Sequence, residues 1–550
     1  MGRWSWLALA LVWGCGSAPP EAELPPKVTP APKPPGPDYV AVVPHAYLPA
    51  LAPLLAYRRA QGHRTFVIET EKTYGTKPDA AALQNAIREV WTKGSLRFVL
   101  LVGDIPRDDE PVADRLPAFY LPKLEYPGSD HADRHLFHRS LLTVQDEQER
   151  FPSDYPYGVM RGEEADVLVG RLPARSAEEV SGFVRKVIDY ETKPIDTPWP
   201  RRVVVHAGPA RFSDVIDRII EHTAVSLLDE EVPYDYDVDL VFGKPGSEYA
   251  PRLDRLGESL TERVNSGAFL LAYVGHSSPA YFDTVEYRGQ SYSIGSRDDF
   301  ERMKIEEGAP IFVSLSCDVG AFDMSKGRRS IAEEAVLNPK GSIAAFASTR
   351  ESHPYPNLLY GEALIARLIH ERPATIGEGI RDVKRDMLTR VNFVGEKLSG
   401  MDSDVLKREH VALYNLFGDP ATRLRYPQPL QPKFVEEGPH APGAELALRI
   451  QSQTAGRAQL TIELPRTQSR ASLVPAEDIE RMPLDAALQA MADNHQRAAD
   501  KVLDRREMTL AAGVTTARIK APDRPGRYVV KLFAFANGGT QAGHAFFEVK

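Results

Sequence analysis

The feature that most constrains the fold is a regular alternation of short apolar runs and amphipathic helical stretches, which begins at Tyr39. YVAVV (39–43), TFVIE (65–69) and FVLLVGD (98–104) are separated by the helical stretches LPALAPLLAYRRAQGH and AALQNAIREVW. Val- and Leu-rich runs of this length, separated by helices, are typical of strands buried on both faces of a mainly parallel sheet. The chain is therefore predicted to be an α/β protein.

The alternation is interrupted and then resumes in a second block. The interruption is a polar stretch over about 105–164, and loops of this length are usually functional. ADVLVGRLPARSAEEVSGFVRKVIDYE then predicts a strand and a helix, with Ser176 as N-cap and Glu179 as its capping-box partner. The later apolar runs are RVVVHAG (202–208), AFLLAYVGHSS (268–278), PIFVSLSCDVG (310–320) and GSIAAFAS (341–348). Helices are predicted near 213–228, 254–266, 357–371 and 375–390.

The last part of the chain changes to a period of two. From about residue 433, the segments ELALRIQ, RAQLTIELP, TLAAGVTTARIKAP and GRYVVKLFAFA alternate apolar and polar residues between turns. This pattern is expected for a small antiparallel sandwich. One helical insertion is predicted at about 476–505. No group of reactive side chains stands out there, so this part is expected to support or bind.

The first residues indicate export. Arg3 precedes about ten mostly apolar residues, a secretory segment that is too short to span a bilayer. Val12-Trp13-Gly14-Cys15 resembles the lipobox of bacterial lipoproteins, although Trp13 stands where a small residue is usual; the alternative is a plain signal peptide that is cut later. The proline-rich residues 16–37 predict an extended spacer. We expect a lipid-anchored protein of the cell envelope, located in the outer membrane because Gly16-Ser17 contains no retention aspartate.

Charge and cysteine content narrow the range of functions. The 550 residues carry a net charge of −9, and no basic cluster is interleaved with aromatic residues, so nucleic acid is not expected as a partner. The chain has two cysteines, Cys15 and Cys317. If Cys15 carries lipid, no second cysteine remains to form a disulfide with Cys317. Such a residue is either a reactive thiol or a small buried apolar group.

Two apolar runs of the second block end in reactive side chains. FLLAYVG leads to His276 and IFVSLS leads to Cys317. If the two strands are neighbours in a parallel sheet, both side chains emerge at the same edge, where functional groups gather in such sheets. A thiol and an imidazole placed together are a nucleophile and a general acid/base. The alternative for His276 is a structural role in a tight turn.

These segments resemble the gingipain-like family of caspase-like cysteine peptidases. The resemblance rests on YVGHSS (273–278), SLSCDVGAF (314–322), GSIAAFAST (341–349), FGDPA (417–421), FVLLVGDIP (98–106) and ADVLVGRLPARSAEE (165–179), in this order. It covers about 39–427 and implies a caspase-like catalytic region in two subdomains. It also implies an immunoglobulin-like β-sandwich for the remainder of the chain.

The resemblance also implies roles for individual residues. Cys317 matches the nucleophile, and His276 matches the histidine that protonates the leaving amine. Backbone N–H groups of Cys317 and Ser277 would form the oxyanion hole; Ser277 stands where the family commonly has glycine. Asp214 matches an acidic residue of the S1 pocket of Arg-specific members, although a carboxylate there could also complement a helix dipole. The acidic residue that supports the histidine has no counterpart.

Metal sites are weaker candidates. His131, His135 and His138 have spacings that could bind a transition metal if helical. Asp104 and Asp154 lie where family members have acidic turns, which could bind structural calcium. No cofactor is expected to be required for catalysis.

The predicted organisation has five parts. They are a lipoprotein signal peptide (1–15), a Pro-rich linker (16–37), an N-terminal α/β subdomain (38–200), a catalytic caspase-like subdomain (201–428) and an immunoglobulin-like β domain (433–550). We expect an exported cysteine endopeptidase that cleaves protein or peptide substrates, after Arg or Lys if Asp214 has the implied role. The alternatives are a processing transpeptidase for exported proteins and an inactive surface binding module.

Overall fold

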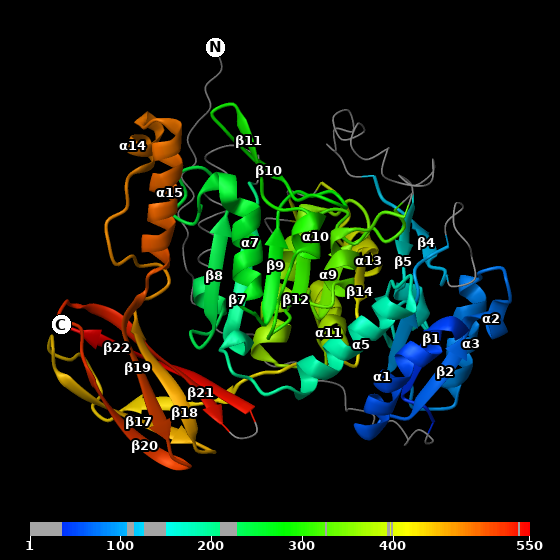
Figure 1. Cartoon of the computed structure of the whole chain (residues 1–550), viewed down its shortest axis with the longest axis horizontal. Helices are drawn as coiled ribbons and strands as arrows, with labels where there is room; N and C mark the ends of the chain where they lie inside the picture. Colours follow the sequence, from blue (N-terminus) through cyan, green and yellow to red (C-terminus); the bar gives the residue numbers. More distant parts are fainter. Residues whose placement is uncertain are drawn as a thin grey trace.

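A single large sheet runs through most of the molecule (Figure 1). The computed structural model describes residues 36–106, 115–125, 150–209, 228–324, 327–392, 396–397, 400–536 and 539–550. In spatial order the ten strands are β2 (Thr65–Glu69), β1 (Tyr39–Val43), β3 (Phe98–Val102), β6 (Leu168–Leu172), β14 (Tyr414–Phe417), β13 (Ala344–Ser348), β12 (Ile311–Leu315), β9 (Leu270–Val274), β7 (Arg202–Ala207) and β8 (Asp237–Phe242).

The sheet is mixed, with two parallel sets of strands. Strands β2, β1, β3 and β6 pair in parallel, as do β8, β7, β9, β12 and β13. Between the sets lies β14, which is antiparallel to β13 and meets β6 at one register pair, Phe417 with Arg171. The predicted α/β sheet is confirmed. The sequence analysis missed β8, whose DVDLVF mixes acidic and apolar residues, and β14, which has only four residues.

Burial explains why these runs form strands. Every residue of β1, β3, β12 and β13 is buried, so both faces of these strands are covered. The helices of this region are α1 (Leu48–Ala60), α2 (Thr70–Tyr74), α3 (Ala80–Thr92), α5 (Ala177–Thr192), α7 (Leu256–Asn265), α8 (Arg297–Glu301), α9 (Ile331–Leu337), α10 (Pro354–Leu364), α11 (Ile376–Thr389) and α13 (Ser403–Leu413). The helix predicted near 213–228 lies outside the described residues, apart from residue 228.

Helix α5 begins as predicted, with one difference. The Ser176 side chain accepts a hydrogen bond from the Glu179 N–H at 3.3 Å. The Glu179 carboxylate, however, accepts from the Arg175 N–H at 2.8 Å and not from that of Ser176. The N-cap is therefore confirmed, and the reciprocal half of the capping box is displaced by one residue.

Two hairpins that the sequence analysis did not recognise interrupt the alternation. Strands β4 (Phe119–Pro122) and β5 (Arg150–Ser153) form one of them, within the polar stretch. Strands β10 (Thr284–Tyr287) and β11 (Gln290–Ser293) form the other, shortly after His276. All four strands have four residues, which is too short for a clear alternating pattern.

The C-terminal part contains two sheets around a core of its own. One sheet is β15 (Gln428–Pro429), β22 (Gly539–Val549), β21 (Gly526–Ala536), β18 (Gly456–Glu463) and β19 (Val502–Leu510); the other is β16 (Gln431–Phe434), β17 (Glu445–Ser452) and β20 (Gly513–Lys520). The predicted helical insertion consists of α14 (Ala476–Arg481) and α15 (Leu484–Ala499). It is shorter than predicted, because residues 502–505 already pair with β18.

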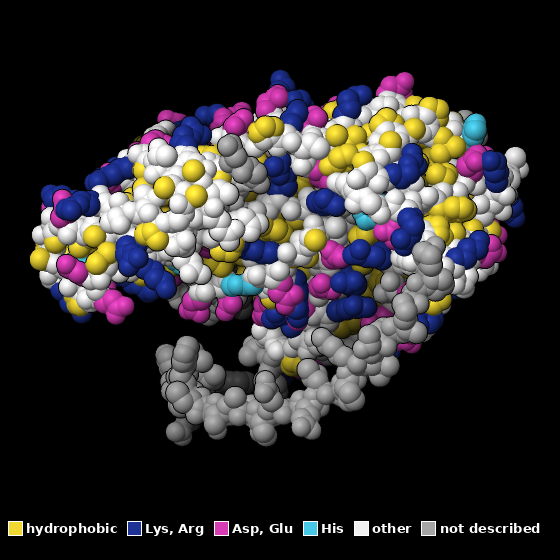
Figure 2. All heavy atoms as spheres, turned by 90° about the horizontal axis from the view of Figure 1, so that it is seen from below, with side chains coloured by type: hydrophobic (Ala, Val, Ile, Leu, Met, Phe, Trp, Pro, Cys, Tyr) yellow, Lys and Arg dark blue, Asp and Glu magenta, His cyan; other side chains and the backbone are white. Residues whose placement is uncertain are grey.

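The helical insertion packs away from the strands of its own part of the chain. Ile479, Leu488 and Met491 belong to the apolar cluster of the large sheet, and Figure 1 shows α15 standing beside α7 and β8. Within the described ranges, no helix is both long and apolar enough to cross a membrane. Figure 2 shows basic and acidic side chains interspersed over the face seen from below.

Candidate active site

Strands β9 and β12 bring the two reactive side chains to one edge of the sheet. The strands are adjacent and parallel, with Val274 opposite Leu315. His276 and Cys317 each follow the last strand residue by two positions, so they leave the sheet at matching places. Both are partly exposed. The prediction that the two strands are neighbours in one parallel sheet is confirmed.

A left-handed turn directly follows Cys317. Asp318 has a φ of +62°, a region that asparagine and aspartate tolerate better than most residues. Its N–H donates to the Arg350 carbonyl at 3.2 Å, and the Gly320 N–H donates to the Ser348 carbonyl at 2.7 Å. The loop after β13 therefore holds the turn after β12 by backbone hydrogen bonds.

A buried ion pair fixes that loop. The Arg350 guanidinium makes two contacts with the Asp323 carboxylate, at 2.8 and 2.5 Å, and both residues are almost fully buried. Burial alone would lower the pKa of Arg350, but Asp323 outweighs it and the pKa is raised. Arg350 is therefore a permanent cation, buried next to the turn that follows Cys317. Arg350 contacts this turn at two places, since its carbonyl accepts from the Asp318 N–H and its guanidinium donates to Asp323. The turn after Cys317 therefore has a fixed shape.

The Cys317 sulfur lies against the backbone of Ser352. The Ser352 N–H donates to Sγ at 3.4 Å, and the Ser352 carbonyl lies 3.7 Å from Sγ in position to accept from the thiol. Ser352 immediately precedes the N-cap of α10. A hydrogen-bond donor and a helix N-terminus both favour a thiolate over a thiol.

The His276 loop is held from below by Tyr273. The Tyr273 hydroxyl donates to the His276 carbonyl at 2.7 Å, and its ring stacks on Phe282 with 3.7 Å between ring centroids. Gly275 has a φ of +151°, and an added Cβ would lie 2.9 Å from that hydroxyl and 3.2 Å from the Gly208 nitrogen. Only glycine fits between Tyr273 and Gly208, which fixes the backbone of the turn that carries His276.

Ser277 joins the two strand ends through its side chain. Its hydroxyl contacts the Ser316 hydroxyl at 2.7 Å and the Cys317 carbonyl at 2.5 Å, and Ser316 in turn contacts the Ser314 hydroxyl at 2.6 Å. The sequence analysis considered only the backbone N–H of Ser277. The signal for the side-chain role was present, because a serine stands where the resemblance expects glycine.

Several predicted site residues lie outside the part of the chain that the structure describes. Asp214 lies outside the described residues, and so do His131, His135 and His138. Among the residues that are described, no cluster of three or more His, Cys, Asp or Glu side chains could hold a metal ion.

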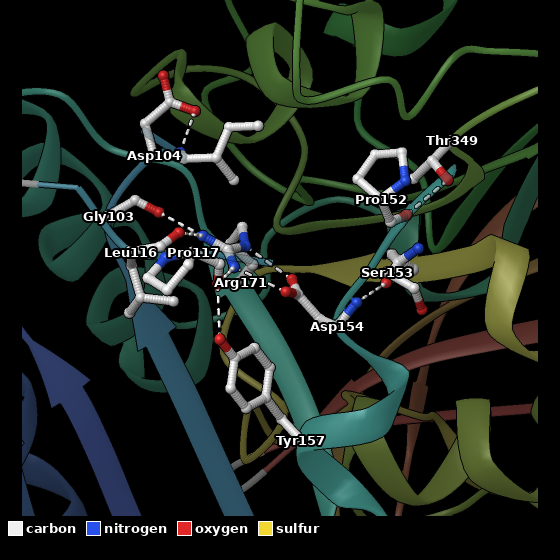
Figure 3. Close-up of polar contacts among 12 residues, drawn as sticks. Gly103, Asp104, Leu116, Pro117, Pro152, Ser153, Asp154, Tyr157, Arg171 and Thr349 are labelled. Carbon is white, nitrogen blue, oxygen red and sulfur yellow. Dashed lines mark hydrogen bonds and ion pairs between the residues drawn. The ribbon is translucent and has the colours of Figure 1, made fainter. Parts of the chain in front are cut away.

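The two candidate calcium ligands both contact arginine. Asp154 accepts two 2.7 Å hydrogen bonds from Arg171 (Figure 3). Asp104 accepts one of 2.6 Å from Arg175. Arg171 also donates to the carbonyl oxygens of Gly103, Leu116 and Pro117. Neither carboxylate presents the oxygen-only environment that calcium prefers. Calcium at either position stays a prediction.

Ser352 is the contact residue that sequence reasoning missed. It follows Cys317 by 35 positions and lies in a loop between β13 and α10. No motif or periodicity identifies a residue that acts through its backbone N–H. Only the tertiary structure brings it to the sulfur.

The chain is similar to known proteins in both sequence and fold. The family model of peptidase family C25 matches residues 32–425. The crystal structure of the Arg-specific cysteine proteinase gingipain R is similar with a TM-score of 0.51 at 17% identity, over 94% of this chain and 98% of that one. The complex of the pro- and mature domains of RgpB from Porphyromonas gingivalis gives a TM-score of 0.49 at 16% identity, over 93% and 100%. No curated protein matches.

Proposed function

The chain belongs to peptidase family C25 and is a cysteine endopeptidase, and on this premise we propose that Cys317 is its nucleophile and His276 its general acid/base. One observation supports this assignment above the others. A partly exposed thiol that receives a backbone N–H at 3.4 Å stands at the same sheet edge as the imidazole, on two strands in register. We further propose that this large mixed sheet, which the gingipain R likeness shows to be gingipain-like, is of the caspase type.

The proposed reaction has two steps. The Cys317 thiolate attacks the scissile carbonyl, a C–S bond forms, and the backbone N–H groups of Cys317 and Ser277 bind the oxyanion. The C–N bond then breaks, and His276 gives its proton to the leaving amine. In the second step His276 takes a proton from water, the water oxygen attacks the thioester carbonyl, and the C–S bond breaks, which releases the acid and restores the Cys317 thiolate and the protonated His276. No cofactor takes part in either step.

A peptide library tests the assignment. The full chain is incubated with mixed peptides and compared with Cys317→Ala and His276→Ala, and the products are identified by mass spectrometry. We expect hydrolysed peptides from the wild type and no products from Cys317→Ala. Products that persist in Cys317→Ala would refute the role of this thiol, and amine-joined products would show transpeptidation instead of hydrolysis.

We propose that the P1 residue is Arg or Lys and that Asp214 binds it. Support comes from the local sequence PARFSDVIDRII and from the Arg-specific character that is given for gingipain R. A carboxylate in a pocket selects a guanidinium by a charge-assisted pair. Asp214→Asn should lower cleavage after Arg and Lys while leaving Cys317 alkylation unchanged. Equal cleavage after Arg by this variant would remove Asp214 from the pocket.

We also propose export and anchoring through a lipid on Cys15, with residues 1–15 as the signal, 16–37 as the spacer and the outer membrane as the location. The support is the lipobox-like Val12-Trp13-Gly14-Cys15. Labelling of the full chain with a fatty acid in a bacterial host, beside Cys15→Ala, tests this proposal. Label retained by Cys15→Ala would contradict it.

For the remaining chain we propose two α/β subdomains, 38–200 and 201–428, and an immunoglobulin-like domain, 433–550. The two facing sheets of the C-terminal part support the last of these. A structural calcium ion remains a proposal without assigned ligands, because Asp104 and Asp154 both bind arginine. Unfolding midpoints that are equal with calcium and with a chelator would reject it.

A further inference from the structure

The loop that touches the Cys317 sulfur is held by side chains that the reaction itself does not use. Asn357, in α10, donates from Nδ2 to the Ser352 hydroxyl at 2.8 Å. The Tyr414 hydroxyl donates to Asn357 Oδ1 at 2.7 Å. The amide of Asn357 is therefore oriented from both ends. A continuous chain of hydrogen bonds runs from Tyr414 through Asn357 to Ser352.

Tyr414 provides a rigid base for this chain. It lies in β14 and is fully buried, with its ring 5.2 Å from that of Phe346 and 4.8 Å from that of Tyr360. Burial raises the pKa of Tyr414 above its ordinary value, so its hydroxyl stays a donor at physiological pH. The position of Ser352 is thus fixed, through Asn357, by a buried tyrosine in the centre of the sheet.

The residue next to Ser352 is fixed independently. The His353 N–H donates to Nε2 of His410 at 2.8 Å, and Nδ1 of His410 donates to the Leu406 carbonyl at 2.8 Å. Burial lowers the pKa of His410 to about 3, so the ring remains a neutral acceptor at physiological pH. Two successive residues, Ser352 and His353, are therefore held from buried positions.

The contact that results favours the ionised sulfur. A thiolate is a charged acceptor, and hydrogen bonds to charged acceptors are roughly twice as strong as neutral ones. The opposing contact, from the thiol to the Ser352 carbonyl at 3.7 Å, uses a weak donor. The titratable and charged residues on the segments around this sulfur are His276, Asp318, Arg350, Glu351, His353 and Tyr414.

Resting on the proposed function, in which Cys317 is the nucleophile, we propose that Asn357 and Tyr414 are positioning residues. They direct the Ser352 N–H toward the Cys317 sulfur and so increase the thiolate fraction at neutral pH. Neither side chain touches the substrate. Their proposed effect passes through the backbone of Ser352.

The test measures the thiol directly. The full chain is alkylated with iodoacetamide across a pH series, and the peptide that contains Cys317 is quantified by mass spectrometry, separately from that of Cys15. Tyr414→Phe and Ser352→Ala each remove one link and keep the Ser352 N–H. Each should raise the midpoint of alkylation by about 0.5 to 1 pH unit. Peptidase kcat at pH 7 should fall by roughly 3- to 10-fold, with KM nearly unchanged.

Tyr157→Phe is the matched control. Tyr157 is also fully buried, and its hydroxyl donates to the Pro117 carbonyl at 2.6 Å, beside the other half of the sheet (Figure 3). Its removal should leave the alkylation midpoint unchanged. A shift in Tyr157→Phe as large as that in Tyr414→Phe would overturn the proposal, since it would show a general effect of lost buried hydroxyls.

The proposal also fails if Tyr414→Phe and Ser352→Ala, both folded by circular dichroism, keep the wild-type midpoint. If Tyr414→Phe does not fold, Ser352→Ala decides alone, because it removes a single hydroxyl from a loop. Alkylation needs no substrate. A shifted midpoint in a chain that cleaves no peptide would therefore support this inference while rejecting the proposed function.

Discussion

The two halves of the large sheet stabilise the segments beyond their strands in different ways. In the half formed by β2, β1, β3 and β6, Arg171 and Asp154 form a fully desolvated ion pair, and three carbonyl oxygens accept the remaining guanidinium donors. In the other half, β9 and β12 lead to His276 and Cys317, which are partly exposed and are positioned by hydroxyls and backbone N–H groups. The first half is thus closed by an ion pair. The second half also buries an ion pair, Arg350 with Asp323, behind the turn after Cys317, but a neutral backbone N–H contacts the thiol, which must stay accessible.

The largest expected effect separates activity from stability. Cys317→Ala should lower peptidase kcat/KM by at least about 10⁴-fold, because it removes the proposed nucleophile. Its free energy of unfolding should change by less than about 1 kcal/mol, since the sulfur is partly exposed. His276→Ala should lose nearly as much activity. Residual activity in Cys317→Ala above a tenth of the wild type would show that the half of the sheet with Cys317 does not supply the nucleophile.

In the half formed by β2, β1, β3 and β6, called here the closed half, we expect a substitution to change stability and not activity. Asp154→Ala leaves the buried guanidinium of Arg171 without its counter-ion and should cost about 3–5 kcal/mol in the free energy of unfolding, measured with urea. The exposed pair of Arg255 and Glu258 is a matched control, and Glu258→Ala should cost less than about 1 kcal/mol. Equal costs for the two variants would show that the closed half does not depend on its ion pair.

Low pH should destabilise the fold through a buried histidine in the half of the sheet that carries Cys317. His206, in β7, is fully buried, and burial lowers its pKa from 6.5 to about 3. The unfolded chain therefore binds more protons between these values, and the stability from the neutral ring is complete above pH 6.5 and lost as pH falls toward 3. Relative to wild type, His206→Leu should lose about 2 kcal/mol less stability between pH 7 and pH 5.

Urea unfolding at the two pH values measures this difference. His410, whose pKa burial also lowers to about 3, remains in both proteins, so His206→Leu should keep part of the pH dependence. Identical pH dependence in wild type and His206→Leu would mean that the His206 ring binds no additional proton on unfolding, and would contradict the lowered pKa.

The smallest expected effect concerns the Ser277 hydroxyl, which lies between the ends of strands β9 and β12. Ser277→Ala removes the hydrogen bond to the Cys317 carbonyl, and a single such bond corresponds to a loss of roughly 2- to 10-fold in kcat/KM. Ser277→Thr keeps the hydroxyl and serves as the control. If Ser277→Ala and Ser277→Thr give equal kcat/KM, the hydrogen bond from the hydroxyl to the Cys317 carbonyl does not contribute to activity.

Sequence patterns predict the scaffold better than the surroundings of the site. Apolar runs identified β9 and β12, and strand-end logic placed His276 and Cys317 at one edge, because these features are local and periodic. Strand β14 was missed because four residues between a helix and Gly418 give no period to count. Its position between the two parallel sets depends on the whole sheet.

The support around the thiol could not be predicted for another reason. Ser352, Asn357 and Tyr414 act through a backbone N–H, an amide and a phenol that lie up to 97 positions from Cys317 in the sequence. Serine, asparagine and tyrosine are common in loops and cores, so nothing in their type marks them. Their relation arises only when β14, α10 and the loop after β13 come together.

The helical insertion makes the C-terminal part difficult to detach. Arg288, in the turn between β10 and β11, donates to the carbonyl oxygens of Ile479, Glu480 and Met482, while Leu488 is buried in the apolar cluster of the large sheet. A protease nick near residue 430 would therefore cut the chain without separating the pieces. The fragments should co-elute in native chromatography and separate only in denaturant. The place where the chain passes into its C-terminal part therefore differs from the place where the noncovalent contacts hold that part to the large sheet.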